Sequence, residues 1–118
     1  MATKTKQRGS GEAGVKAAVQ QLLATYGIPC YRMNSGKLVM GKRGVVQLNP
    51  KGTPDLLASP QRAQMCGTYL WIETKAPGKK PTVEQLEFKM WAERRGEHWL
   101  CVDDVQQVID WLKEHGAI

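Results

Sequence analysis

The chain has 118 residues, of which 42% are hydrophobic and 24% are charged, as in a small soluble domain with one modest core. Seventeen lysine and arginine residues against eleven aspartate and glutamate residues give a formal net charge of +6, which favours a polyanion such as nucleic acid as the partner. Because no apolar run is long enough to span a bilayer and no signal peptide is recognisable, we expect a cytoplasmic, DNA-associated protein without a membrane partner.

The N-terminal part of the chain predicts a tail followed by a helix. Residues 1–9 are polar and basic, and we expect a flexible tail that either touches phosphates or simply frays. Residues 10–118 are expected to form a single domain. Its first helix is predicted over residues 10–26, with Ser10 in the position of an N-cap and Gly27 in the position of a helix stop.

Strands are predicted next in the chain. The expected segments are residues 28–34, 37–40, 45–48, 55–58 and 68–73. The second and third of these strands are predicted to pair as a hairpin. Its tip carries Lys42 and Arg43, which either meet a phosphate backbone or form an ordinary solvated turn.

The C-terminal part predicts two helices around one more strand. Thr82 and Gln85 have the spacing of a capping box at the start of a helix over residues 82–95, and residues 98–102 follow as a strand. The apolar side chains of this helix are expected on or beside one packed stripe: Val83, Leu86, Phe88, Met90, Trp91 and Ala92. Asp103 is expected to cap a last helix. The order α-β-β-β-β-β-α-β-α is that of an α/β fold, with a central mixed sheet flanked by helices.

Three charged residues lie at the ends of two of these strands. Asp55 follows Pro54 at the entrance of one strand, and Glu73 and Lys75 come at the end of the next. On a strand, Glu73 and Lys75 point to the same face, about 6–7 Å apart. Asp55 alone is typical of a turn, and Glu73 with Lys75 of a surface pair. Two carboxylates and an ammonium at one edge of an apolar sheet are nevertheless costly to gather without a cation or substrate between them.

This group has the composition of a metal site. Oxygen ligands from Asp55 and Glu73, with the backbone carbonyl of Thr74, suit Mg²⁺ or Mn²⁺. Such an ion polarises a phosphodiester and lowers the pKa of a bound water molecule. Lys75 would hold the attacking water or neutralise charge that grows on the phosphate. Gln85 could orient the water or a phosphate in addition to capping its helix.

Other chemistries fit the sequence poorly. Cys30, Cys66 and Cys101 are widely spaced and include no Cys-x-x-Cys pair, so we expect neither a disulfide framework nor a zinc or iron–sulfur site. The two histidines, His98 and His115, form no His-rich cluster in the sequence. The chain has no Gly-x-x-x-x-Gly-Lys-[Ser/Thr] loop, so no nucleotide cofactor is expected.

Four segments, in chain order, carry a family resemblance: Gly52-Thr53-Pro54-Asp55-Leu56, Ile72-Glu73-Thr74-Lys75, Thr82-x-x-Gln85-x-x-Phe88 and Gly96. Together they resemble the VRR-NUC family of the PD-(D/E)XK nuclease superfamily, and most of all its compact, stand-alone form found in bacteriophages. The match covers about residues 10–110 in order. It implies a restriction-endonuclease-like core.

The resemblance implies roles for five residues. Asp55 and Glu73 would bind the metal ion, Lys75 would be the catalytic lysine, and Gln85 would be the glutamine carried by a helix. The family has a further acidic residue on its first helix that reaches the metal site, and Glu12 matches it by position. Without the resemblance, Glu12 would be assigned only to the favourable end of a helix dipole.

The function implied is Mg²⁺- or Mn²⁺-dependent hydrolysis of DNA phosphodiester bonds. Small members are similar to Holliday-junction resolvases and act as homodimers, which implies a structure-selective endonuclease for branched DNA in repair or recombination. A flap or single-strand nuclease of the same fold, and a non-catalytic module that binds branched DNA, stay open as alternatives. A nuclease that reads sequence ranks last, because the chain is short for a recognition domain. The expected phosphate contacts are Lys37, Lys42, Arg43, Lys79 and Lys80.

Overall fold

The computed structural model describes residues 11–33, 37–39, 42, 44–47, 49–60 and 68–118. The elements in these residues are α1 (Glu12–Thr25), β1 (Cys30–Arg32), β2 (Lys37–Val39), β3 (Val45–Gln47), β4 (Leu56–Ala58), β5 (Leu70–Thr74), α2 (Val83–Arg94), β6 (His98–Val102) and α3 (Val105–Glu114). This order confirms the predicted α-β-β-β-β-β-α-β-α succession. The expected tail, residues 1–9, lies outside the described residues.

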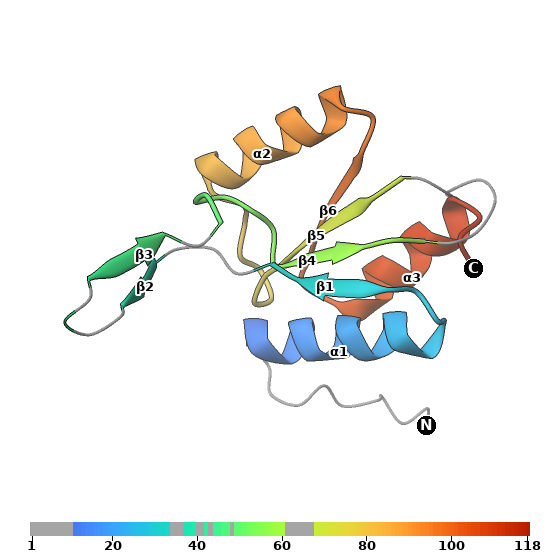
Figure 1. Ribbon diagram of the computed structural model, residues 1–118. Coiled ribbons are helices and arrows are strands. Elements are labelled where there is room, and N and C mark those ends of the chain that lie inside the picture. Colours follow the sequence, from blue (N-terminus) through green and yellow to red (C-terminus); the bar gives the residue numbers. More distant parts are fainter. Residues whose placement is uncertain (1–10, 34–36, 40–41, 43, 48, 61–67) are drawn as a thin grey trace.

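The main sheet contains four of the strands, in the order β1-β4-β5-β6. The β1–β4 and β4–β5 pairs are antiparallel and the β5–β6 pair is parallel, so the sheet is mixed, as predicted. Among the described residues, the strands β2 and β3 pair with each other as a separate two-stranded sheet and form the expected hairpin. Figure 1 shows this hairpin projecting from the body of the molecule, beside the edge at which α1 begins.

Helices cover both faces of the main sheet. Figure 1 shows α1 and α3 on one face and α2 on the other. Every residue of β5 is buried, because this strand lies in the interior of the sheet with helices on both sides. The core between the sheet and the α1–α3 layer is built from apolar side chains of both, including Val15, Val19, Leu23, Leu56, Leu70, Ile72, Val108 and Leu112.

The helix ends differ from the prediction at two positions. Ser10 lies outside the described residues, and α1 begins after Gly11, which offers no side-chain cap. The N-cap of α3 is Asp104, which forms a capping box, and the prediction of Asp103 as the cap is therefore wrong. The carboxylate of Asp103 instead accepts a hydrogen bond of 3.0 Å from the backbone N–H of Gly78.

Fewer side chains of α2 pack against the sheet than the sequence predicted. The capping box of Thr82 and Gln85 is present. Ala92 is buried and the ring of Phe88 packs edge-on against Trp71 at 4.8 Å, so this side of the helix meets the sheet. The prediction that the whole apolar stripe is packed is wrong, because four of its side chains are exposed: Val83, Leu86, Met90 and Trp91.

Two further expectations concern thiols and membranes. Cys30 and Cys101 are partly buried, and burial raises the pKa of each thiol to about 11, so both stay protonated at neutral pH. Cys66 lies outside the described residues. In the part of the chain that the structure describes, no helix is long and apolar enough to cross a membrane.

Candidate metal centre

The register between β4 and β5 explains how Asp55 and Glu73 meet. Leu56 lies opposite Ile72 in this antiparallel pair, so the next position of the ladder places Asp55 opposite Glu73. Directly opposed residues of antiparallel strands share a face, with Cβ atoms about 4.5–5.5 Å apart. Two acidic residues at such a position repel each other when both are ionised. The strand pairing therefore creates a site that a proton or a cation must neutralise.

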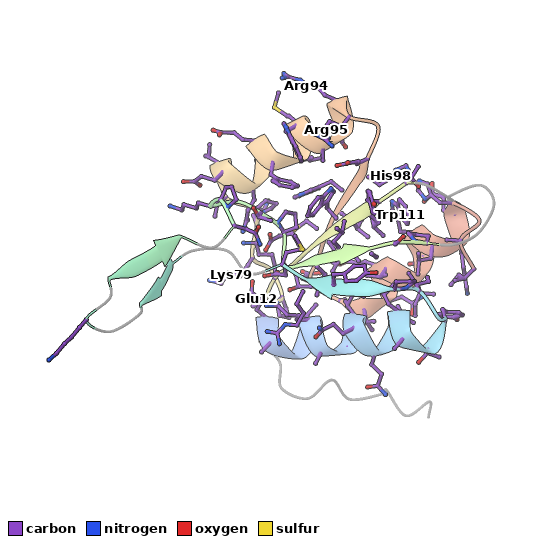
Figure 2. The ribbon with its side chains drawn as sticks, in the orientation of Figure 1. Glu12, Lys79, Arg94, Arg95, His98 and Trp111 are labelled. Atoms are coloured by element: carbon purple, nitrogen blue, oxygen red, sulfur yellow. The ribbon has the colours of Figure 1, made fainter. Side chains whose placement is uncertain are left out.

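A third carboxylate comes from the first turn of α1. Figure 2 shows Glu12 at the beginning of this helix, at the edge of the sheet where β4 starts and β5 ends. Glu12, Asp55 and Glu73 each offer one carboxylate oxygen, and these atoms all lie within 4.8 Å of one another. The structure thus brings together all three predicted carboxylates, although most of α1 and the strands β1, β2 and β3 lie between Glu12 and the other two.

The carboxylate of Asp55 is held on two sides. Its Oδ2 atom accepts hydrogen bonds from the backbone N–H of Thr74 at 3.0 Å and from the Thr74 hydroxyl at 2.8 Å. Its Oδ1 atom lies 3.3 Å from the ammonium of Lys16. Burial by itself would raise the pKa of Asp55, but the two Thr74 hydrogen bonds and the charge of Lys16 outweigh it and hold the pKa below the ordinary value. Asp55 is therefore a fixed, ionised carboxylate.

Glu73 has the opposite character. Only 3% of the residue is exposed, and burial, followed by the charge of Asp55 and a hydrogen bond with it, raises the pKa of Glu73 to about 8. In the metal-free protein at neutral pH, Glu73 therefore carries a proton and shares it with Asp55. Neighbouring carboxyl groups whose pKa values are pushed apart in this way are frequent at functional sites.

The donor set fits a hard divalent cation. Three carboxylate oxygens at this spacing are the ligands that Mg²⁺ and Mn²⁺ prefer, whereas a zinc site of the usual kind would need sulfur or imidazole ligands. A bound cation would also replace the proton of Glu73, because it supplies the positive charge that the three clustered side chains lack. Glu12, Asp55 and Glu73 are thus the residues that could hold a metal ion.

The other predicted site residues lie around this cluster. Lys75 directly follows β5, and its charge opposes the rise in the pKa of Glu73 that burial and Asp55 cause. Thr74 is fully buried and its amide and hydroxyl serve Asp55. The side chain of Gln85 accepts a hydrogen bond of 2.8 Å from the backbone N–H of Thr82, so the observed contact of Gln85 is its capping role.

A close contact fixes the loop before Asp55 against α2. Gly52 has φ +95°, and a Cβ atom added there would lie 2.5 Å from the carbonyl oxygen of Glu84 in the first turn of α2. Lys51 pairs with the Glu84 side chain at 3.3 Å. The loop that delivers Asp55 and the helix turn that carries Gln85 are therefore packed backbone to backbone, which only glycine permits at position 52.

The predicted phosphate contacts are spread over two segments. Lys79 and Lys80 are exposed on the loop after β5, and Figure 2 shows Lys79 at the edge of the molecule where α1 begins. Lys42 is exposed between the hairpin strands, and Lys37 begins β2. Arg43 lies outside the described residues.

One member of the cluster was not predicted from the sequence. Lys16 follows Glu12 by four residues, so the two side chains share one face of α1. This spacing could have predicted that Lys16 lies near the site, because residues four apart on a helix lie on the same face. No pattern in the sequence indicates, however, that the partner of Lys16 is Asp55.

Comparisons with known proteins point in one direction. No family model matches the sequence, and no curated protein matches it. A solved structure described as a VRR_NUC domain is similar in three dimensions, with a TM-score of 0.60 and 27% sequence identity. The similarity covers 88% of this chain and 95% of that chain, so it extends over nearly the whole of both.

Proposed function

We propose that this chain, which belongs to the VRR-NUC family, is a nuclease that hydrolyses DNA phosphodiester bonds with the help of a divalent cation, Mg²⁺ or Mn²⁺. One observation carries the proposal. Carboxylate oxygens of Glu12, Asp55 and Glu73, one from each residue, lie within 4.8 Å of one another. The α/β architecture, with a mixed sheet between helices, is consistent with a core of the PD-(D/E)XK type.

Each residue of the centre has its own role in hydrolysis. Glu12, Asp55 and Glu73 would hold the cation, and the hydrogen bonds from Thr74 keep Asp55 in one orientation for this purpose. A bound divalent cation would polarise the phosphodiester and make an attacking water more acidic. Lys75 then orients the water or stabilises negative charge on the phosphate, as a preorganised ammonium in a partly buried site does.

The distribution of charge along the chain supports a polyanionic substrate. No aspartate or glutamate occurs between Glu12 and Asp55, although this stretch carries six cations: Lys16, Arg32, Lys37, Lys42, Arg43 and Lys51. The acidic residues are instead concentrated after residue 83. The acid-free stretch includes the projecting hairpin β2–β3, beside the edge that carries the metal centre (Figure 1). DNA bound at this edge would meet positive charge on the hairpin and on the loop of Lys79 and Lys80.

Branched DNA is the proposed substrate, and a homodimer the proposed active form. A four-way junction has two-fold symmetry, and a two-fold dimer would place one metal centre on each of two opposed strands. Four exposed apolar side chains of α2 offer a surface for a second copy: Val83, Leu86, Met90 and Trp91. A flap or single-strand nuclease would use the same centre without needing this symmetry.

The decisive experiment compares cleavage of labelled four-way junctions, flaps, single strands and linear duplexes in Mg²⁺ and in EDTA. We expect metal-dependent cleavage, with paired symmetric cuts across the four-way junction. Cuts confined to flaps or single strands would support the alternative nuclease. Binding of junctions with no cleavage in either Mg²⁺ or Mn²⁺ would instead support a non-catalytic module.

Two variants assign the chemistry to the proposed residues. Asp55→Asn keeps an acceptor oxygen for Thr74 but removes the charge, and Lys75→Met keeps the aliphatic stem but removes the ammonium. Each should lower the cleavage rate by at least about 100-fold, the scale of a lost charge-stabilising group. Lys113→Met, which removes an exposed charge in the last turn of α3, should cleave normally. Normal rates in Asp55→Asn or Lys75→Met would contradict the proposed mechanism.

A further inference from the structure

The ammonium of Lys16 contacts the carboxylate at the centre of the acidic cluster. We propose that Lys16 is a counter-charge of the metal centre, which pairs with Asp55 in the metal-free protein and, by competing with the cation for that carboxylate, sets how tightly the cluster binds a divalent cation. The inference rests on the proposed function, since it concerns the same site. It assigns a role to a residue of α1 that does not itself bind the cation.

The contacts show how this role arises. Thr74 fixes the Oδ2 side of Asp55 through two hydrogen bonds, and Lys16 lies 3.3 Å from the Oδ1 side. The carboxylate is therefore clamped between two elements, β5 and α1. Glu12, on the same face of α1 one turn earlier, is itself a member of the cluster. A single helix thus supplies one ligand and one counter-charge to the centre.

The pair differs from an ordinary surface ion pair in its surroundings. The side chains of Lys16 and Asp55 are only 25% and 22% exposed, so water screens the attraction less than it does at the surface. Asp55 also lies beside two further carboxyl groups. Lys16 therefore places a positive charge directly beside Asp55 in the metal-free protein.

The same charge has a consequence for metal affinity. A cation that binds Glu12, Asp55 and Glu73 must share Asp55 with the ammonium of Lys16, and the two positive charges repel each other. Lys16 should therefore weaken metal binding, while the two hydrogen bonds from Thr74 keep Asp55 in place without it. A purely structural residue would have the opposite effect, because its removal would loosen Asp55 and lower the affinity.

Metal binding to four proteins tests the inference: the wild type, Lys16→Met, Lys16→Arg and Lys113→Met. Mg²⁺ is titrated at one fixed pH and ionic strength for all four proteins. Binding is followed by the rise in unfolding temperature with Mg²⁺ concentration. Lys16→Met should bind Mg²⁺ about tenfold more tightly, on the scale of a partly screened charge pair. Lys16→Arg and Lys113→Met, which keep the local charge, should match the wild type.

Each outcome decides a definite point. Tighter binding in Lys16→Met alone supports the proposed role. Equal or weaker binding in Lys16→Met would overturn the inference and leave the proposed function intact, provided that the wild type binds Mg²⁺. Absence of any Mg²⁺ effect on the wild type would contradict the metal centre itself, and the role of Lys16 with it.

Discussion

Replacing Glu73 with glutamine should make the metal-free protein more stable and at the same time inactive. The folded chain raises the pKa of Glu73 from 4.5 to about 8, so below pH 8 the folded state holds a proton that the unfolded state releases above 4.5. The stability linked to this proton is complete below pH 4.5 and is lost as the pH rises to 8. Glutamine has no proton to lose and can still donate a hydrogen bond to Asp55.

The magnitude follows from the two pKa values. Each pH unit between 4.5 and 8 removes roughly 1.4 kcal/mol from the free energy of unfolding of the wild type. The full effect at pH 8 and above is therefore about 4–5 kcal/mol, a large part of the stability of a small domain. Glu73→Gln should escape this loss. Its advantage over the wild type should be small near pH 5 and largest near pH 8.5.

Urea unfolding in EDTA, followed by tryptophan fluorescence between pH 5 and 9, measures the difference. Glu114→Gln, at the exposed end of α3, is the matched control and should follow the wild-type profile. The lowered pKa values of Asp55 and His98 also act in this range or below it, but they affect wild type and variant alike. Parallel stability curves for Glu73→Gln and wild type from pH 5 to 8.5 would refute the reasoning. Mg²⁺ should stabilise the wild type far more than Glu73→Gln.

The remaining predictions concern the contact between the Asp55 loop and α2. Gly52→Ala should lower the free energy of unfolding by about 2–4 kcal/mol, because its Cβ would lie 2.5 Å from the Glu84 carbonyl oxygen at φ +95°. Gly78→Ala, at φ +81° with open space around it, should lose only about 1–2 kcal/mol in the same urea assay, and equal losses would contradict the packing argument. Thr82→Ala should lower stability by about 1 kcal/mol through the lost cap and leave the cleavage rate of the folded protein unchanged. Gln85→Ala should lower both the stability and the cleavage rate. A cleavage rate equal to that of Thr82→Ala would show that Gln85 only caps the helix.

Local patterns predicted the elements well because helix and strand periodicity are properties of short segments. The order of helices and strands, the hairpin and the capping box of α2 all follow from residues close together in the sequence. The misplaced cap of α3 shows the limit of such reasoning. Asp103 and Asp104 are adjacent and equally suited to cap a helix. Asp104 is the cap in the structure, and Asp103 instead accepts a hydrogen bond from the distant amide of Gly78.

The exposed side chains of α2 show a second limit. Apolar residues at helical spacing indicate a buried stripe only if a partner surface is wide enough to cover it. The sheet contacts α2 around Phe88 and Ala92, and the neighbouring apolar side chains stay 44–69% exposed. The width of the contact between α2 and the sheet depends on how the two dock, which cannot be predicted from the sequence of either segment alone.

The sequence by itself determined which residue types could form a metal centre: an aspartate at the start of one predicted strand, a glutamate and a lysine at the end of the next, and a glutamate on the first helix. Only the tertiary structure decided that three carboxylates converge, because the β4–β5 register and the docking of α1 set distances between residues far apart in the chain. The same docking brought Lys16 to Asp55. The tertiary structure also raises the pKa of Glu73 to about 8, because only the folded chain buries this carboxyl and places the charge of Asp55 beside it.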